Sequence, residues 1–211
     1  MEALVVIGYF IGAYLLGAVP FSYLVARAVS GIDLRRVGSG TVSGSGVGVA
    51  AGFWPMAVAG LLDIGKGAAA VVPMAGARPM LAALGAGVAA VGHNWSPFLR
   101  GAGGRALSVA GGATLIMAWP GTLTLALGLV VGRLFRQTGL GSFVSQAALP
   151  AVLAVTDGAV GAVLGGALVA PMWAKRILGN SPPRERRPAT YLSRLLFDHD
   201  PGWVASDRLA R

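Results

Sequence analysis

One stretch of the chain has the composition of an anion-binding loop. Residues 31–46 read GIDLRRVGSGTVSGSG, with two arginines followed by closely spaced glycines and hydroxyl residues. Glycine permits turns that expose successive backbone N–H groups, while hydroxyl and guanidinium groups add donors and positive charge. The predicted phosphate ligands in this first loop are Arg35, Gly38, Ser39, Gly40 and Thr41, with Ser39 also a catalytic candidate. A flexible linker has a similar composition, so this stretch taken alone leaves both interpretations open.

A second stretch, residues 91–109, reads VGHNWSPFLRGAGGRALSV and combines imidazole, amide and guanidinium groups. A glycine pair before a helix brings backbone N–H groups and the positive end of that helix to one point. Arginine then adds a two-pronged partner for phosphate. The predicted ligands are Asn94, Gly103 and Gly104, and the catalytic candidates are His93 and Arg105. The alternative for His93 is an interfacial side chain that is hydrogen-bonded to backbone.

The third stretch, residues 132–142, reads GRLFRQTGLGS. Arg136 is a predicted substrate ligand, although arginines at such positions more commonly anchor a helix at the inner membrane interface. Ser142 begins the next apolar segment, where we expect it to cap a helix and also count it as a catalytic candidate.

Two ionisable residues lie inside an apolar segment. Asp63 and Lys66 are three positions apart and therefore share one face of a helix. Ionisable groups at membrane depth are costly unless they are paired or face a polar cavity. Either the two residues form a structural ion pair, or they help to organise the nearby anion site.

Other kinds of catalytic chemistry have no support in the sequence. There is no cysteine, no G-x-S-x-G nucleophile motif and no evident acidic partner for either histidine. We also find no carboxylate cluster with the spacing of a metal site, so we predict neither a metal nor a cofactor. The candidate residues are therefore suited to holding and polarising an anionic substrate.

The elements that position these residues are membrane helices. The 211 residues are 55% hydrophobic and only 12% charged, with a mean hydropathy of +0.70. Soluble domains carry about 25% charged residues, so the composition predicts an all-α, polytopic transmembrane bundle. The net charge of +9 is distributed between the apolar segments, without an aromatic and basic nucleic-acid signature. A membrane surface or an anionic substrate explains this charge, and we expect no nucleic-acid partner.

About seven apolar segments are expected, and the fourth is short enough to span only partly. Their approximate ranges are 3–27, 50–75, 79–98, 106–118, 120–135, 141–156 and 158–174. Arginine is concentrated in alternate connections, which by the positive-inside rule predicts an outside N-terminus and a cytoplasmic C-terminus. The glycine pairs Gly8/Gly12, Gly128/Gly132 and Gly161/Gly165 are expected to let helices pack closely.

The chain divides into a membrane domain, residues 1–180, and a basic cytoplasmic tail, residues 181–211. Prolines at the start of the tail prevent continuation of the last helix. The apolar side chains of Tyr191, Leu195, Leu196 and Phe197 are suited to a short amphipathic helix on the inner membrane surface. The other interpretation is a partly disordered tail.

Taken together and in order, these motifs resemble the bacterial acyl-phosphate:glycerol-3-phosphate acyltransferase family. The resemblance rests on GAVPFSYLVAR, GIDLRRVGSG, LLDIGKG, GHNWSPFLRGAGGR and RQTGLGS, between about Gly17 and Gly179. It implies a seven-helix membrane bundle in the cell membrane with its site facing the cytoplasm. The implied reaction moves a fatty acyl group from acyl phosphate to the 1-hydroxyl of glycerol 3-phosphate, which yields lysophosphatidic acid.

The resemblance also assigns roles by position. Ser39 lies in the family's GSG turn, His93 matches the histidine of its GH motif, and Arg105 stands where the family has lysine. The remaining matches are Gly103 and Gly104, Arg136 and Ser142, and Asp63 with Lys66. The chain departs from the family pattern GSGNxGATN, because Thr41, Ser43, Ser45 and Gly46 replace Asn, Gly, Thr and Asn.

The resemblance implies direct attack of the glycerol phosphate hydroxyl on the acyl carbonyl, because acyl phosphate already has a good leaving group. The enzyme would hold two phosphates close together and stabilise their charge. Acyl phosphate, glycerol 3-phosphate and membrane lipids are the expected partners. Two other functions stay open: an inactive paralogue that binds phosphate or lipid as a membrane subunit, and a transporter with a polar path to the outer face.

Overall fold

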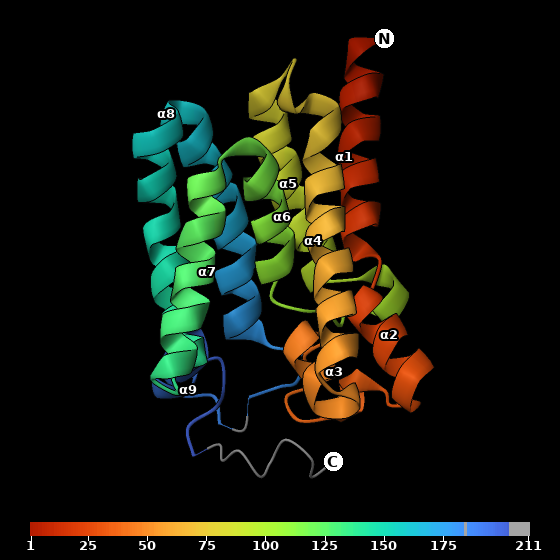
Figure 1. Ribbon diagram of the computed structural model, residues 1–211, viewed down its shortest axis with the longest axis vertical. Helices are drawn as coiled ribbons and strands as arrows, with labels where there is room; N and C mark the ends of the chain where they lie inside the picture. The colour runs from red at the N-terminus through yellow and green to blue at the C-terminus, as the bar shows by residue number, and fades with distance from the viewer. Residues whose placement is uncertain (184, 203–211) are drawn as a thin grey trace.

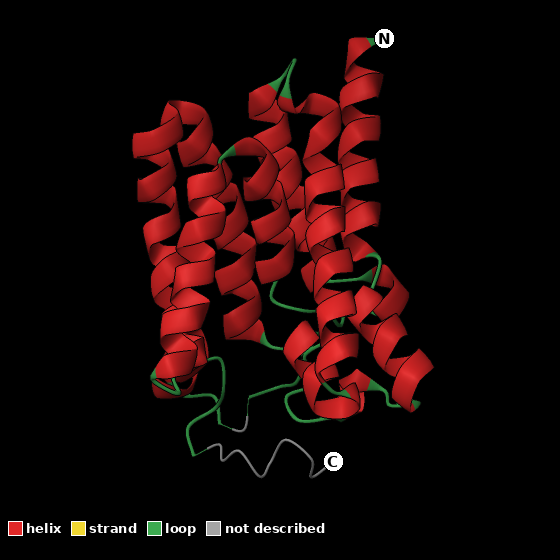
Figure 2. Cartoon of the chain, in the orientation of Figure 1, coloured by secondary structure: helices red, strands yellow, loops and turns green. Residues whose placement is uncertain are grey.

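The computed structural model describes residues 1–183 and 185–202, and the described chain is a bundle of helices (Figure 1). Figure 2 shows that loops are short except at the end of the bundle near the C-terminus. The helices within residues 1–180 are α1 (Glu2–Ala18), α2 (Phe21–Ser30), α3 (Gly44–Ala51), α4 (Phe53–Ala75), α5 (Pro79–Asn94), α6 (Leu107–Met117), α7 (Trp119–Leu134) and α8 (Thr138–Leu178). Two 3-10 turns, η1 (Leu34–Arg36) and η2 (Pro97–Leu99), and the tail helix α9 (Pro188–Phe197) complete the described elements.

Helix α8 consists of two helices that run in opposite directions. Its backbone leaves the helical region at Gly158, where φ is 62° and ψ is −142°. The two halves then pack side by side, because Gly165 lies against Pro150 and Gly161 against Leu153. A left-handed φ of this kind is inexpensive for glycine. In the described part of the chain, the lengthwise segments therefore number seven: α1, α4, α5, α6, α7 and the two halves of α8. The N-terminus and the tail helix α9 lie at opposite ends of the bundle (Figure 1).

The sequence predicted one continuous segment over residues 3–27. This prediction is wrong, because the helix breaks at Val19 and Pro20. Proline lacks the N–H that would continue the helix and disfavours helical geometry at the preceding residue. The break leaves the Ala18 and Val19 carbonyls without helical donors. Ser96 donates to the first at 2.7 Å and Lys66 donates to the second, also at 2.7 Å. A proline break thus draws polar side chains from two other segments to one place within the bundle.

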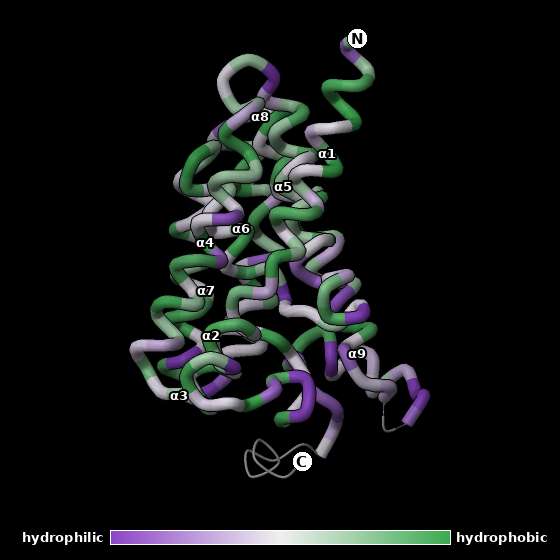
Figure 3. Tube along the Cα trace, turned by 90° about the vertical axis from the view of Figure 1, so that its right-hand side faces the viewer, coloured by the Kyte–Doolittle hydropathy of each residue, from purple (hydrophilic) through white to green (hydrophobic). Residues whose placement is uncertain are grey.

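Hydropathy and length agree with a membrane protein. Within the described residues, three helical stretches are long and apolar enough to cross a bilayer: Glu2–Ser30, Phe53–Ala75 and Thr138–Leu178. Helices α6 and α7 are shorter apolar helices, and α6 has only 11 residues, as expected for the fourth segment. In Figure 3 the apolar residues line the middle of the bundle, while hydrophilic ones gather at the end that carries α2, α3 and α9.

Close backbone contacts hold the lengthwise helices together. Gly67 of α4 lies against the Val109 carbonyl of α6, and Gly112 of α6 lies against the Ile64 carbonyl of α4. The predicted packing is confirmed for Gly128/Gly132 and Gly161/Gly165, which also face backbone or side chains at close range. For Gly8/Gly12 the predicted packing is wrong within the described chain, because a methyl group at either position would meet none of its atoms within 4 Å. Apolar side chains near them on α1 point outward instead.

Gly112→Ala is expected to destabilise the bundle by about 1–3 kcal/mol, because the added methyl would overlap the Ile64 carbonyl oxygen. The neighbouring Gly111→Ala is the matched control, since a methyl there has no atom within 4 Å. Thermal unfolding of each variant in the same detergent measures the effect. Equal midpoints for the two variants would show that the close approach of α4 and α6 is not a feature of the folded protein.

Candidate active site

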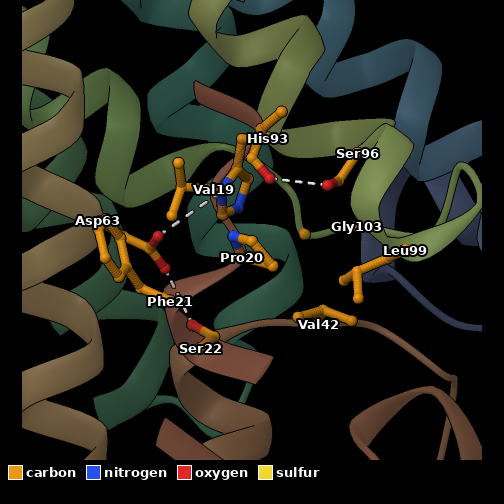
Figure 4. Close-up of a pocket in the computed structure, with 12 residues that line it drawn as sticks. Val19, Pro20, Phe21, Ser22, Val42, Asp63, His93, Ser96, Leu99 and Gly103 are labelled. Atoms are coloured by element: carbon orange, nitrogen blue, oxygen red, sulfur yellow. Dashed lines mark hydrogen bonds and ion pairs between the residues drawn. The ribbon is translucent and has the colours of Figure 1, made fainter. Parts of the chain in front are cut away.

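A pocket lies where the broken α1–α2 junction meets the middle of α4, the end of α5 and parts of the first and second loops (Figure 4). It is lined by Ala18, Val19, Pro20, Phe21, Ser22, Val42, Asp63, His93, Ser96, Leu99, Gly103 and Gly104. Figure 4 shows side chains from four separate segments directed toward the same space. Three of the sequence's candidate regions therefore meet here: the first loop, the second loop and the ionisable pair of α4.

The ionisable pair is embedded in a buried polar network. Lys66 Nζ lies 2.8 Å from an Asp63 carboxylate oxygen, and Ser22 donates to the other oxygen at 2.9 Å. Asp63 and Lys66 are 2% and 3% exposed, so each ion is buried with its partner. The pair satisfies the requirement that buried charges be paired, and through Asp63 it also borders the pocket. Asp63 and Lys66 therefore form a structural ion pair, and the same pair helps to build the wall of the pocket.

His93 has an acidic neighbour that the sequence analysis did not find. Its Nδ1 lies 3.8 Å from Asp63, although the two residues are 30 positions apart. The Nε2 side of the ring faces Gly104, because a methyl group on Gly104 would overlap Nε2. The absence of side chains at Gly103 and Gly104 therefore makes room for the imidazole and for the neighbouring backbone. At 3.8 Å the carboxylate and the ring are neighbours without a direct hydrogen bond.

Asn180 joins the first and second loops. Its amide nitrogen donates to the Gly40 carbonyl at 3.0 Å and to the Gly103 carbonyl at 2.8 Å, while its oxygen accepts from the Gly103 N–H at 3.1 Å. The Val42 N–H also donates to the Gly103 carbonyl, at 3.0 Å. One side chain that follows α8 thus fixes the relative position of two loops more than 60 residues apart in sequence.

Basic side chains gather beside the Gly103–Gly104 turn. Arg105 donates from Nη1 to the Lys175 carbonyl at 3.3 Å and from Nε to Asp198 at 2.6 Å. Lys175 is 1% exposed; its ammonium donates to the Gly101 carbonyl and lies 5.2 Å from the centre of the Trp95 ring. Arg176 is also buried, at 2% exposure. Three buried or half-buried cations at one turn make a region suited to binding an anion.

The first loop contributes backbone groups to the site, whereas its charged side chain Arg35 is engaged within the loop. Arg35 donates to both carboxylate oxygens of Asp33, at 3.0 and 2.7 Å, and these hydrogen bonds lower the pKa of Asp33. Its guanidinium also lies over the Tyr23 ring, so the predicted ligand Arg35 is engaged within its own loop. Ser39 is exposed, and its hydroxyl is 2.8 Å from that of Thr41. Gly38 and Gly40 adopt left-handed turns, with φ of 56° and 69°.

The third stretch does not line the pocket. Ser142 lies in the second turn of α8, where it accepts a hydrogen bond from Gln146 at 2.9 Å, so the expectation that it caps a helix is wrong. The helix begins earlier, at Thr138. Arg136 is exposed in the turn after α7. This stretch contacts the basic region through Gly139, whose carbonyl accepts from Arg176 at 2.7 Å.

Asn94 supports the site from inside the bundle. Its amide nitrogen donates to the Pro171 carbonyl of α8 at 2.8 Å, and the side chain is fully buried. Its amide oxygen has no hydrogen-bond partner among the described residues. The predicted substrate ligand is thus placed between α5 and α8 rather than on the surface of the pocket.

Sequence reasoning missed Asn180, Ser22, Lys175 and Arg176 as members of the site. The signal for the last two was available, because adjacent cations near the end of an apolar helix are expensive unless they have a function or a partner. Asn180 and Ser22 gave no such signal, since isolated polar residues after a helix and near a proline are common.

The comparisons with known proteins agree with this architecture. The family profile described as glycerol-3-phosphate acyltransferase matches residues 7–178. A glycerol-3-phosphate acyltransferase of Synechococcus sp. (strain CC9902) is 37% identical over 182 residues, which cover 81% of this chain and 90% of that protein. Glycerol-3-phosphate acyltransferase 2 of Moorella thermoacetica is 41% identical over 141 residues, 65% of this chain and 72% of that protein.

Solved structures show the same fold. The crystal structure of PlsY (YgiH), an integral membrane glycerol 3-phosphate acyltransferase, in its glycerol 3-phosphate form superimposes with a TM-score of 0.73 at 23% identity. The alignment covers 79% of this chain and 86% of that one. The lysophosphatidic acid form gives the same TM-score over 98% of this chain and 99% of that one, at 20% identity. By the extent of the profile match and the identity to its relatives, this chain belongs to the glycerol-3-phosphate acyltransferase family.

Proposed function

We propose that this protein transfers a fatty acyl group from acyl phosphate to the 1-hydroxyl of glycerol 3-phosphate, giving lysophosphatidic acid and inorganic phosphate. Membership of the family supports acyl transfer to glycerol 3-phosphate. The observation that carries the proposal is the meeting of the Gly103–Gly104 turn with Arg105, Lys175 and Arg176 beside a pocket at the end of an apolar bundle. An acyl phosphate fits this arrangement, because its phosphate can bind the cations while its acyl tail lies against the apolar helices.

The proposed mechanism is a direct displacement. The 1-hydroxyl oxygen of glycerol 3-phosphate attacks the acyl carbonyl carbon, the new ester bond forms, and the bond between that carbon and the phosphate oxygen breaks. The departing phosphate accepts the hydroxyl proton. Two phosphates held side by side repel each other, and the cations around Arg105 offset this repulsion. Holding both substrates in reach contributes the remaining acceleration through proximity.

His93 and the glycine pair have supporting parts in this mechanism. The imidazole is held between Asp63 and Gly104, so its Nε2 faces the turn at which we place a phosphate. We propose that the imidazole of His93 orients a substrate phosphate. The acyl chain is placed in lipid between apolar helices, which are exposed on the outside of the bundle.

Reconstitution with defined donors tests the proposed function. Purified protein in lipid nanodiscs receives glycerol 3-phosphate together with either palmitoyl phosphate or palmitoyl coenzyme A. We expect lysophosphatidic acid and an equal amount of phosphate only with palmitoyl phosphate, and no product when glycerol replaces glycerol 3-phosphate. Turnover with the coenzyme A ester would contradict the donor assignment, and binding of glycerol 3-phosphate without turnover would favour an inactive lipid- or phosphate-binding subunit.

The site is proposed to face the cytoplasm of a cell membrane, because the arginine-rich connections lie at its end of the bundle. At the opposite end, Arg78 forms an ion pair with Glu2 at 2.9 Å. The chain has no cysteine, so single-cysteine variants report sidedness without background. In intact cells, a membrane-impermeant maleimide is expected to label Thr156→Cys, at the end away from the site, and to spare Ser45→Cys. The reverse labelling pattern would place the site outside.

A further inference from the structure

The C-terminal tail docks beside the basic region. Helix α9 follows α8 after a nine-residue connection and lies below the α7–α8 end of the bundle (Figure 1). This segment falls outside residues 7–178, the part of the chain that the family profile matches. The profile does not describe the contacts of α9 with the site, whereas the alignment with the lysophosphatidic acid form of PlsY extends over 98% of this chain.

Two kinds of contact hold α9 in place. Arg194, only 7% exposed, donates to the carbonyls of Leu178 and Ser181, both at 3.2 Å, and forms an ion pair with Asp200. These bonds satisfy one carbonyl in the last turn of α8, which lacks a helical donor, and one in the connection that follows. The Phe197 backbone also packs directly on Gly139. The end of α9 is thus fixed against both ends of α8.

This docking carries the Asp198 carboxylate to two arginines. Asp198 follows α9 in a left-handed conformation, with φ of 65°. One carboxylate oxygen lies 2.6 Å from Arg105 Nε and 3.8 Å from Arg176 Nε. Of the Arg176 guanidinium, Nη2 donates to the Gly139 carbonyl, whereas Nε and Nη1 have no hydrogen-bond partner in the described chain. A buried guanidinium with two unsatisfied nitrogens has capacity for another acceptor.

The charges favour a phosphate over the carboxylate. Arg105, Lys175 and Arg176 lie together, and Asp198 is the one carboxylate that forms ion pairs with any of them among the described residues. A phosphate dianion offers more charge and more acceptor oxygens than a carboxylate, and guanidinium groups bind it through paired hydrogen bonds. For a phosphate to reach both Arg105 and Arg176, the partly exposed Asp198 side chain must move away.

We propose that Arg105 and Arg176 form one binding site for a phosphate monoester or acyl phosphate, and that Asp198 occupies this site as an internal competitor when substrate is absent. The proposal rests on the proposed function for the identity of the ligand. It makes Arg176 a direct ligand of the phosphate. It also gives the tail a role, which is to set how much phosphate-bearing substrate is needed for occupancy. The apparent affinity equals the affinity of the open site multiplied by the fraction of molecules in which the site is open.

Asp198→Asn tests the competition. Asparagine keeps the shape and tolerates the left-handed backbone, but it lacks the negative charge. We expect inorganic phosphate and glycerol 3-phosphate to bind the full-length variant about threefold to tenfold more tightly than the unaltered protein, measured by calorimetry in nanodiscs. The matched control is Glu185→Gln, which removes a tail carboxylate that pairs at 3.2 Å with the exposed Arg187, and its binding is expected to be unchanged.

Steady-state kinetics show whether glycerol 3-phosphate or acyl phosphate occupies the site. They also distinguish competition by Asp198 from a role of Asp198 in positioning Arg105. Each substrate is varied with the other saturating, and the substrate whose KM falls in Asp198→Asn identifies the ligand of the site. A lower kcat with unchanged KM and unchanged phosphate binding would overturn the proposal, because Asp198 would then position Arg105. Equal effects of Asp198→Asn and Glu185→Gln would also overturn it, because overall charge would explain them.

The test does not depend on turnover. If the protein makes no lysophosphatidic acid but Asp198→Asn still binds phosphate more tightly, the proposed function fails and the competition stands. Arg176→Lys provides a second check that keeps the charge. It is expected to weaken phosphate binding by about tenfold, and unchanged binding would remove Arg176 from the site.

Discussion

Replacing Arg105 with alanine is expected to lower kcat/KM by about 100-fold to 1000-fold, the range found when one charge-stabilising donor is removed from an active site. Arg105 follows the Gly103–Gly104 turn and is held by the Lys175 carbonyl, so its guanidinium is already oriented before substrate binds. Its removal leaves two phosphates with less compensating charge. The measurement is initial-rate kinetics in nanodiscs with palmitoyl phosphate and glycerol 3-phosphate.

Two further variants serve as comparisons for Arg105→Ala. Arg105→Lys keeps the charge but loses the two-pronged geometry, so it is expected to retain more activity than Arg105→Ala. Arg100→Gln is the positional control, because Arg100 is exposed in the same loop and does not line the pocket. Its kinetics are expected to match those of the unaltered protein. Robust turnover by Arg105→Ala would show that phosphate is bound elsewhere.

The second large effect is expected from Asn180→Asp. The substitution keeps the size of the side chain but replaces the amide nitrogen, which donates to Gly40 and Gly103, with an oxygen. A carboxylate facing two carbonyls repels them, and the loss of these bonds amounts to about 2–4 kcal/mol. Because this side chain joins the first and second loops, we expect about 100-fold lower activity, with little loss of the helical bundle itself.

The neighbouring Ser181→Ala is the control for Asn180→Asp. The Ser181 contact that anchors the tail is made by its backbone carbonyl, so alanine preserves it. Circular dichroism and thermal unfolding check that the helices of Asn180→Asp remain. An Asn180→Asp protein with normal activity would mean that the two loops do not need this connection.

Hydropathy predicted most of the fold because the membrane imposes strong rules. Long apolar segments must be helical in lipid, and the short α6 followed from its short apolar range. The break at Val19 and Pro20 was missed, since the segment stays apolar across it and only the proline marks it. That break matters for the site because it frees the carbonyls that bind Ser96 and Lys66.

The site was only partly predictable. Local composition identified the first two loops and the Asp63–Lys66 pair, whose spacing on one helix fixes their contact. Contacts between distant segments carry no local pattern, so neither the approach of Asp63 to His93 nor the connection made by Asn180 was foreseen. Arg35 was an expected ligand on charge alone, yet the nearby Asp33 holds it.

The central claim is that loops far apart in sequence form one pocket for a phosphate-bearing substrate, and ligand protection of a single cysteine tests it most directly. Ser39→Cys places a thiol in the first loop. Ser30→Cys places a control thiol at the end of α2, where the exposed native hydroxyl donates to the Ala26 carbonyl. At about ten times its Kd, glycerol 3-phosphate leaves about a tenth of the sites free. We predict that it slows maleimide modification of Ser39→Cys by about tenfold and leaves Ser30→Cys unchanged. Equal rates at Ser39→Cys with and without bound glycerol 3-phosphate would contradict a shared pocket.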